Sequence, residues 1–65
     1  MKLLLNGEPI TSNEKTLKGV LDTNGYAEAR VATAVNGSFV PAALRADHAI
    51  EDGDQIEVLA PMQGG

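Results

Sequence analysis

The chain has 65 residues, of which 43% are hydrophobic, 3% aromatic and 22% charged. This length is enough for one small domain and too short for two. It contains no cysteine and one histidine, which excludes disulfides, thiolate zinc sites and a cysteine nucleophile and argues against an enzyme. The net charge of −4, the scarcity of aromatic residues and the lack of a long apolar run argue against nucleic-acid and membrane partners and predict a soluble, cytoplasmic protein.

The first segment is typical of a β-hairpin. Residues 1–6 and 8–12 are separated at Asn6-Gly7, a dipeptide that readily supplies the positive φ angles of a tight turn. Pro9 has no backbone N–H, so we expect the second strand to lie at a sheet edge or to begin at this residue. Strand alternation places Leu4 on the face that points away from the core.

The hydrophobic period changes to that of a helix between residues 13 and 25. Three apolar residues recur with a spacing of three and four, namely Leu17, Val20 and Leu21. Either Thr16 or Asn13 can cap the start of this helix. Gly25 is placed to end it in the left-handed conformation, which brings Tyr26 over Leu21.

A second hairpin is predicted after the helix. Residues 30–36 alternate in hydrophobicity and end at Asn36-Gly37, which leads into residues 38–40. Pro41 closes this segment, and residues 42–49 are compatible with either a helical turn or a loop. Asp52-Gly53-Asp54 predicts a turn rather than a cation site.

The last strand is expected at residues 55–60. Ile56 and Val58 alternate with Glu57 and Leu59, so the two pairs lie on opposite faces. The element order predicts an α+β fold, in which a mixed sheet of four to five strands packs on one main helix. The first and last strands then lie side by side in parallel, which is a ubiquitin-like β-grasp. We expect one domain at residues 1–60 and a flexible tail at residues 61–65.

The Gly64-Gly65 pair bears most directly on function. A terminal glycine has no Cβ, so its backbone can enter a narrow slot, and its carboxylate is open to attack. Five residues at roughly 3.3 Å each reach about 16 Å, which is enough to enter a partner's active site. After AMP transfer from ATP, the carboxylate becomes a mixed anhydride that a sulfur or amine nucleophile can open. The alternative is that glycines stand at this end because nothing packs there.

The outer face of the sheet is the second candidate site. Leu59 and Leu4 fall on it, with Phe39 and Glu57 as further residues that could dock a partner. Alternatively, the segment that contains Phe39 or Leu44 folds over the two leucines. The acidic residues around the last strand, Glu51, Asp52, Asp54 and Glu57, form either a solvated face or a surface that steers a basic partner. His48 is expected to be a surface histidine.

Several short motifs together resemble the ThiS family of thiamin-biosynthesis sulfur carriers, part of the MoaD/ThiS superfamily. In order, these are Asn6-Gly7-Glu8, Thr16-Leu17, Val35-Asn36-Gly37, Val40-Pro41, Asp52-Gly53-Asp54 and Gln63-Gly64-Gly65, and they span nearly the whole chain. One departure is Ala42-Ala43, where family members often have Arg-Ser, and it affects a partner contact rather than the fold.

The resemblance implies a function for the tail formed by Gln63, Gly64 and Gly65. The Gly65 carboxylate would be adenylated by an E1-like, ATP-dependent adenylyltransferase (ThiF), converted to a thiocarboxylate with sulfur from a desulfurase system, and used by thiazole synthase (ThiG). ATP would belong to the partner, and the chain itself would hold no cofactor or metal. Alternatives are the small subunit of molybdopterin synthase, which tends to be longer, a conjugating ubiquitin-like modifier, and an acidic protein-interaction module.

Overall fold

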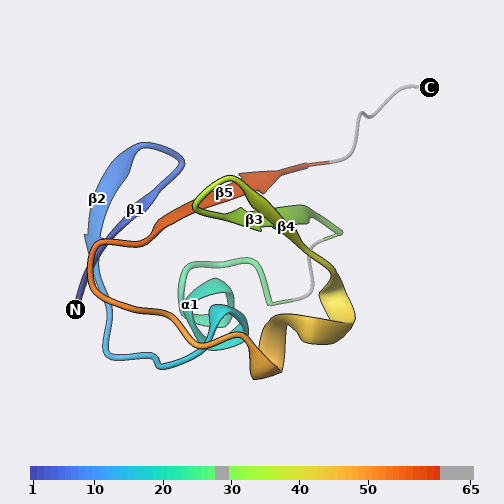
Figure 1. Cartoon of the computed structure of the whole chain (residues 1–65), viewed down its shortest axis with the longest axis horizontal. Coiled ribbons are helices and arrows are strands. Elements are labelled where there is room, and N and C mark those ends of the chain that lie inside the picture. Colours follow the sequence, from blue (N-terminus) through green and yellow to red (C-terminus); the bar gives the residue numbers. More distant parts are fainter. Residues whose placement is uncertain (28–29, 61–65) are drawn as a thin grey trace.

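The structure is a computed structural model that describes residues 1–27 and 30–60. In these residues the elements follow in the order β1 (Lys2–Leu5), β2 (Glu8–Thr11), α1 (Leu17–Thr23), β3 (Ala32–Val35), β4 (Ser38–Val40), the 3-10 helix η1 (Ala42–Asp47) and β5 (Gln55–Leu59). The five strands form one sheet in the order β2-β1-β5-β3-β4 (Figure 1). The predicted tail at residues 61–65 lies outside the described residues.

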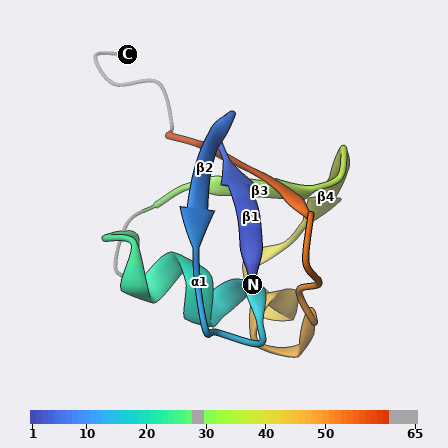
Figure 2. The same cartoon turned by 90° about the vertical axis from the view of Figure 1, so that its left-hand side faces the viewer.

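β5 occupies the centre of the sheet although it is the last strand in the sequence. It pairs in parallel with β1 and antiparallel with β3, and the helix lies in the connection between these strands. α1 and η1 lie on the same side of the sheet (Figures 1 and 2). This arrangement confirms the predicted β-grasp topology, including the parallel pairing of the first and last strands.

Both predicted hairpin turns are present at Asn-Gly dipeptides. Asn6 and Asn36 each have a φ of 51°, and the glycines that follow have φ values of 82° and 85°. A two-residue turn makes Leu5 and Glu8 the hydrogen-bonded closing pair, so the next pair, Leu4 and Pro9, is non-hydrogen-bonded. The nitrogen of Pro9 therefore faces the open edge of β2, where a missing N–H costs no ladder bond. The prediction of an edge strand is confirmed.

α1 begins and ends as its cap residues predict. Thr16, rather than Asn13, is the N-cap, and its Oγ1 accepts a hydrogen bond from the Gly19 N–H at 3.1 Å. At the other end Gly25 adopts a φ of 91°, and the Tyr26 N–H donates to the Leu21 carbonyl at 2.9 Å, as in a Schellman motif. A Cβ at Gly19 would meet the movable carboxylate end of Glu14 and would lie 3.1 Å from the Glu14 Cβ.

The segment after Pro41, which the sequence left open between helix and loop, is the 3-10 helix η1. None of its side chains is buried, and η1 lies against α1. Arg45 donates from Nε to the Thr33 hydroxyl at 2.9 Å and from Nη2 to the Val31 carbonyl at 2.6 Å. This guanidinium ties the 3-10 helix to β3.

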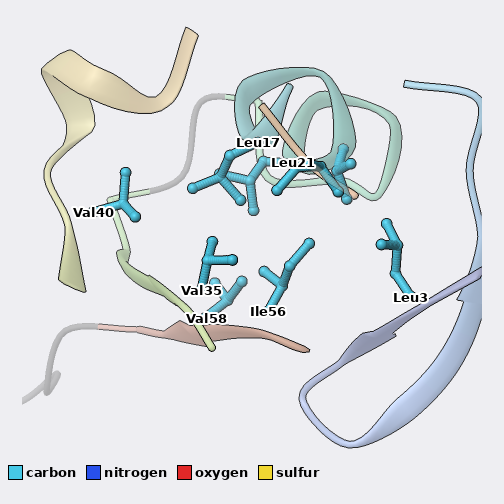
Figure 3. Close-up of a cluster of buried hydrophobic side chains, with 9 residues drawn as sticks. Leu3, Leu17, Leu21, Val35, Val40, Ile56 and Val58 are labelled. Atoms are coloured by element: carbon cyan, nitrogen blue, oxygen red, sulfur yellow. The ribbon is translucent and has the colours of Figure 1, made fainter. Parts of the chain in front are cut away.

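The hydrophobic core lies between α1 and one face of the sheet (Figure 3). Its buried residues are Leu3, Leu17, Val20, Leu21, Val35, Val40, Ile50, Ile56 and Val58. Met1, Leu5 and Ile10 are half-buried against this cluster, so the first hairpin contributes less to the core than alternation alone suggests. In the part of the chain that is described, no helix has the length and apolarity needed to span a bilayer.

Candidate functional site

The sheet face opposite α1 carries the predicted docking residues. The strand registers place Leu4 beside Gln55, and Glu57 beside Ala34. We call this surface the outer face; its members are Lys2, Leu4, Pro9, Thr11, Ala32, Ala34, Phe39, Gln55, Glu57 and Leu59. In β5 the burial alternates residue by residue, with Ile56 and Val58 buried and their neighbours exposed, as predicted.

Two large apolar side chains on the outer face are exposed. Leu59 is 65% exposed and Phe39 is 69% exposed, so the alternative in which Phe39 folds over Leu59 is wrong. Leu44 does not cover Leu59 either, because it is 54% exposed and belongs to η1, on the other side of the sheet. Leu4, by contrast, is half-buried.

The pairing explains why these side chains stand free. Phe39 lies opposite Ala34, and Leu59 lies opposite Ala32. Each cross-strand neighbour contributes a single methyl group, which gives an aromatic ring or a leucine little surface to pack against. Glu57 lies on the other side of Ala34 and is exposed. The outer face therefore presents apolar groups at its β3-β4-β5 end with one carboxylate beside them.

A shallow groove adjoins this surface where the first hairpin meets β5. It has a volume of about 370 Å³ and is lined by Leu4, Asn6, Gly7, Gln55, Ile56 and Glu57. Glu57 thus borders both the groove and the exposed apolar groups. A partner side chain that enters the groove would meet one carboxylate and the polar amides of Asn6 and Gln55.

The acidic residues that looked like one cluster have separate roles. Asp52 Oδ1 accepts the Lys2 N–H at 2.7 Å, and Asp54 Oδ2 accepts the Glu51 N–H at 2.8 Å. Asp54 Oδ1 also accepts the side-chain amide of Asn36 at 2.9 Å. These two carboxylates therefore hold the turn before β5, as the turn prediction implies. Glu57 is the acidic residue that lies on the outer face itself.

The single histidine lies near the start of α1, whereas the predicted tail lies outside the described residues. His48 is half-buried, and its backbone carbonyl accepts the Leu17 N–H at 2.9 Å where α1 begins. Gln63, Gly64 and Gly65 lie outside the described residues. Leu59 is the last residue of β5, so the exposed leucine comes directly before the segment that leads to them.

A contact of Asn6 is a feature that the sequence did not reveal. Its side-chain Oδ1 accepts the Val58 N–H at 2.7 Å, across 52 positions in the sequence. The Asn6-Gly7 dipeptide indicated a turn and nothing more, because the partner of the amide depends on the parallel pairing of β1 and β5. The predicted pairing of β1 with β5 was the only indication in the sequence that this turn lies close to β5.

Comparison with known proteins assigns the family. The model of the ThiS family matches residues 3–65. The chain belongs to the ThiS family. The resemblance found in the sequence motifs is therefore confirmed, and Ala42-Ala43, which departs from the ThiS pattern, lies at the exposed start of η1.

Relatives and solved structures agree with the ThiS assignment. The sulfur carrier protein ThiS of Thermus thermophilus is 43% identical over 61 residues, which cover 94% of this chain and 95% of that protein. A crystal structure of the thiamine biosynthesis protein ThiS from Geobacter metallireducens superposes with a TM-score of 0.84 at 29% identity, over all of both chains. A solution structure of a thiamine biosynthesis protein from the same organism gives a TM-score of 0.77 at 28% identity, covering this chain fully and 88% of that one. These likenesses confirm the predicted fold.

One relative is a longer protein. A thiazole synthase of Paramagnetospirillum magneticum is 36% identical over 66 residues, which cover the whole of this chain. They account for 20% of that thiazole synthase, so a ThiS-like segment is one part of a larger polypeptide there.

Proposed function

We propose that this chain is a sulfur carrier of thiamin biosynthesis whose reactive group is the Gly65 carboxylate. The observation that carries the proposal is the placement of β5, which bears the exposed Leu59 and leads directly into the segment that ends in Gly64-Gly65. A partner that binds the outer face is therefore positioned to receive the end of the chain. Family membership and the identity to the Thermus thermophilus carrier support the same function.

The chemistry proceeds in two stages in partner enzymes. An E1-like adenylyltransferase of the ThiF type joins the Gly65 carboxylate to the AMP part of ATP, with release of pyrophosphate. A persulfide of a desulfurase system then attacks the acyl carbon and expels AMP, and a thiol of the partner cleaves the resulting acyl disulfide, which releases the thiocarboxylate and leaves a disulfide on the partner. This chain has no cysteine and one histidine, so we assign the catalytic groups to the partners. Gly64 and Gly65 have no Cβ and supply the narrow backbone that enters their sites, and Gln63 is the tail residue that precedes them.

We further propose that thiazole synthase is the acceptor of the sulfur. The thiazole synthase of Paramagnetospirillum magneticum contains a segment that matches this whole chain. A carrier-like segment and a thiazole synthase that share one polypeptide are held permanently close together. That arrangement supports a working contact between the two proteins when they are separate chains.

The docking surface proposed for these partners is the exposed part of the outer face. Leu59 and Phe39 supply apolar area, and Leu4 adds the half-buried part next to the groove. Exposed apolar groups with a polar rim are typical of protein-binding surfaces. Glu57 provides a carboxylate that pairs with a basic residue of the partner and fixes the orientation of binding.

The test is a change at the end of the chain. Deletion of Gly65, or Gly65→Ala, is expected to abolish sulfur transfer and leave the free energy of unfolding unchanged, because the buried core residues of the described part of the chain all lie between positions 3 and 58. Chemical denaturation measures the stability, and the rate of thiazole formation measures the transfer. Intact mass of the protein recovered from cells should show one oxygen replaced by sulfur in the wild type and not in the deletion variant.

Two results would contradict the proposal. Thiazole formation at the wild-type rate with the deletion variant excludes a role for Gly65. Recovery of Gly65 attached to lysine side chains of other proteins, with no sulfur in the free chain, identifies a conjugating modifier.

A further inference from the structure

Asn6 and Asn36 occupy equivalent places in the two hairpins but act at opposite ends of β5. Both residues have a φ of 51° and are followed by glycine. Each side-chain Oδ1 accepts a backbone N–H of β5: Asn36 from Gln55 at 2.9 Å, at the start of the strand, and Asn6 from Val58 at 2.7 Å, near its end. The two turns thus hold the central strand by its two ends.

The end of β5 near Val58 depends on Asn6 because β1 stops short of it. The parallel register of β1 and β5 covers only two pairs, Leu4 with Gln55 and Leu5 with Ile56. The Asn6 N–H then donates to the Ile56 carbonyl at 2.9 Å, and the chain turns away at Gly7. The first hairpin ends beside β5 in both views (Figures 1 and 2).

The Asn6 side chain therefore takes the place of the next rung of the ladder. In a parallel pair, a further residue of β1 would offer a carbonyl to the Val58 N–H. Here the amide oxygen of Asn6 accepts that N–H, in partly buried surroundings where an unpaired amide is costly. On the opposite side, β3 pairs with β5 as far as Leu59. Among the described residues, this is the last hydrogen bond on the β1 side of β5 before Ala60.

We propose that Asn6 is a positioning residue for the transfer reaction. By holding Val58 it keeps the end of β5 in the sheet, and so fixes where the segment that leads to Gly65 begins relative to the exposed Leu59. This inference rests on the proposed carrier function. A partner that binds the outer face then meets the start of that segment in one arrangement, which lowers the cost of bringing the end of the chain to the reacting groups.

The two asparagines provide a matched pair of variants. Asn6→Gly and Asn36→Gly both keep a residue that adopts a φ near 51° without strain, and both remove the amide oxygen that accepts from β5. Asn36→Gly also removes the bond to Asp54, so its loss of stability should be at least as large. Asn36→Gly is therefore the control: it lowers the stability of the fold but leaves the hydrogen bond at Val58 in place. Asn6→Asp keeps an acceptor oxygen and a residue tolerant of positive φ, and serves as the rescue.

The first measurement requires no partner. Amide hydrogen exchange followed by NMR should be faster at Val58 and Leu59 in Asn6→Gly than in the wild type, while Asn36→Gly should accelerate exchange at Gln55 instead. Equal protection of Val58 in the wild type and Asn6→Gly would overturn the inference.

The second measurement uses each variant as the substrate of an activating enzyme of the ThiF class, with release of pyrophosphate as the signal. In Asn6→Gly we expect kcat to fall about two- to ten-fold, the range that one lost hydrogen bond spans. KM should change less than kcat, because Asn6→Gly leaves the exposed apolar groups of Leu59 and Phe39 in place. Asn36→Gly and Asn6→Asp should keep the wild-type kcat.

The outcomes separate this inference from the proposed function. A wild-type chain that never receives AMP or sulfur overturns the carrier function itself. If the wild type is adenylated and the two glycine variants lose activity equally, the effect is one of general stability and the positioning role of Asn6 is wrong. A rise of KM with an unchanged kcat in Asn6→Gly would also overturn it, since that result places Asn6 in the docking contact.

Discussion

At the scale of single residues, the hydroxyl of Thr33 connects three parts of the fold. Thr33 is 2% exposed, and its Oγ1 donates to the Val40 carbonyl at 2.8 Å. The same oxygen accepts from Arg45 Nε at 2.9 Å, so β3, β4 and η1 meet at one atom. Loss of the hydroxyl would therefore leave two polar groups, the Val40 carbonyl and Arg45 Nε, without this hydrogen-bond partner.

Thr33→Val tests this connection. Valine has nearly the shape of threonine, so the variant removes the hydrogen bonds and little else. We expect the free energy of unfolding to fall by about 1–3 kcal/mol, the cost of leaving buried polar groups unsatisfied. Chemical denaturation gives the value, and Thr11→Val, on the exposed side of an edge strand, is the control with an expected change within about 0.5 kcal/mol. An equally small loss for Thr33→Val would mean that Arg45 and Val40 find water instead.

At the scale of elements, β5 carries core residues and residues of the proposed docking surface along one strand. Val58 faces the core and Leu59 faces outward, so adjacent residues lie on opposite faces. The same separation applies to β4, where Val40 is buried and Phe39 is exposed. Alternation in these strands means that the outer face can change without disturbing the core.

Leu59→Glu is the variant that exploits this separation. Since Leu59 is largely exposed, the free energy of unfolding should change by no more than about 0.5 kcal/mol. Binding to a ThiF-type enzyme or to thiazole synthase should weaken about ten-fold, because an apolar contact is replaced by a charge. Isothermal titration measures the binding, and Gln55→Glu adds the same charge to the same face at the other end of β5 as a control. Similar weakening by both variants would point to charge alone.

The elements could be predicted where local chemistry decides them. The two Asn-Gly turns, the Thr16 cap and the Gly25 stop act over a few residues, and all are present. The outcome at residues 42–47 could not be predicted, because the partners of this 3-10 helix, such as Thr33 for Arg45, lie far away in the sequence. The exposure of Leu59 could not be predicted either, because it depends on a residue far away in the sequence, Ala32, which lies opposite it in β3.

At the scale of the whole molecule, the stability depends on a very small core. Leu17 is fully buried at the start of α1, and its neighbours in the cluster come from both the helix and the sheet (Figure 3). A domain of this length has a total stability of about 3–10 kcal/mol, at roughly 0.05–0.15 kcal/mol per residue. One core leucine therefore represents a large share of the whole.

Leu17→Ala should accordingly cost about 2–5 kcal/mol and leave a marginally stable or unfolded protein. Urea denaturation followed by circular dichroism measures the change. Leu44→Ala, the same substitution at a side chain that is 54% exposed on η1, should shift the midpoint only slightly. A modest loss for Leu17→Ala would indicate that the helix moves to fill the space.

The place of β5 has a consequence for protein synthesis. Each hairpin can close from neighbouring residues, but β1 and β3 have no contact in the sheet until residues 55–59 come between them. A chain that terminates before residue 55 is left with two separate hairpins, and its outer face does not form. Since the same strand leads to Gly64-Gly65, an enzyme that binds the folded face selects chains translated as far as the segment that bears the proposed reactive end. A partner that binds the outer face, as proposed, would therefore discriminate against chains that end before β5.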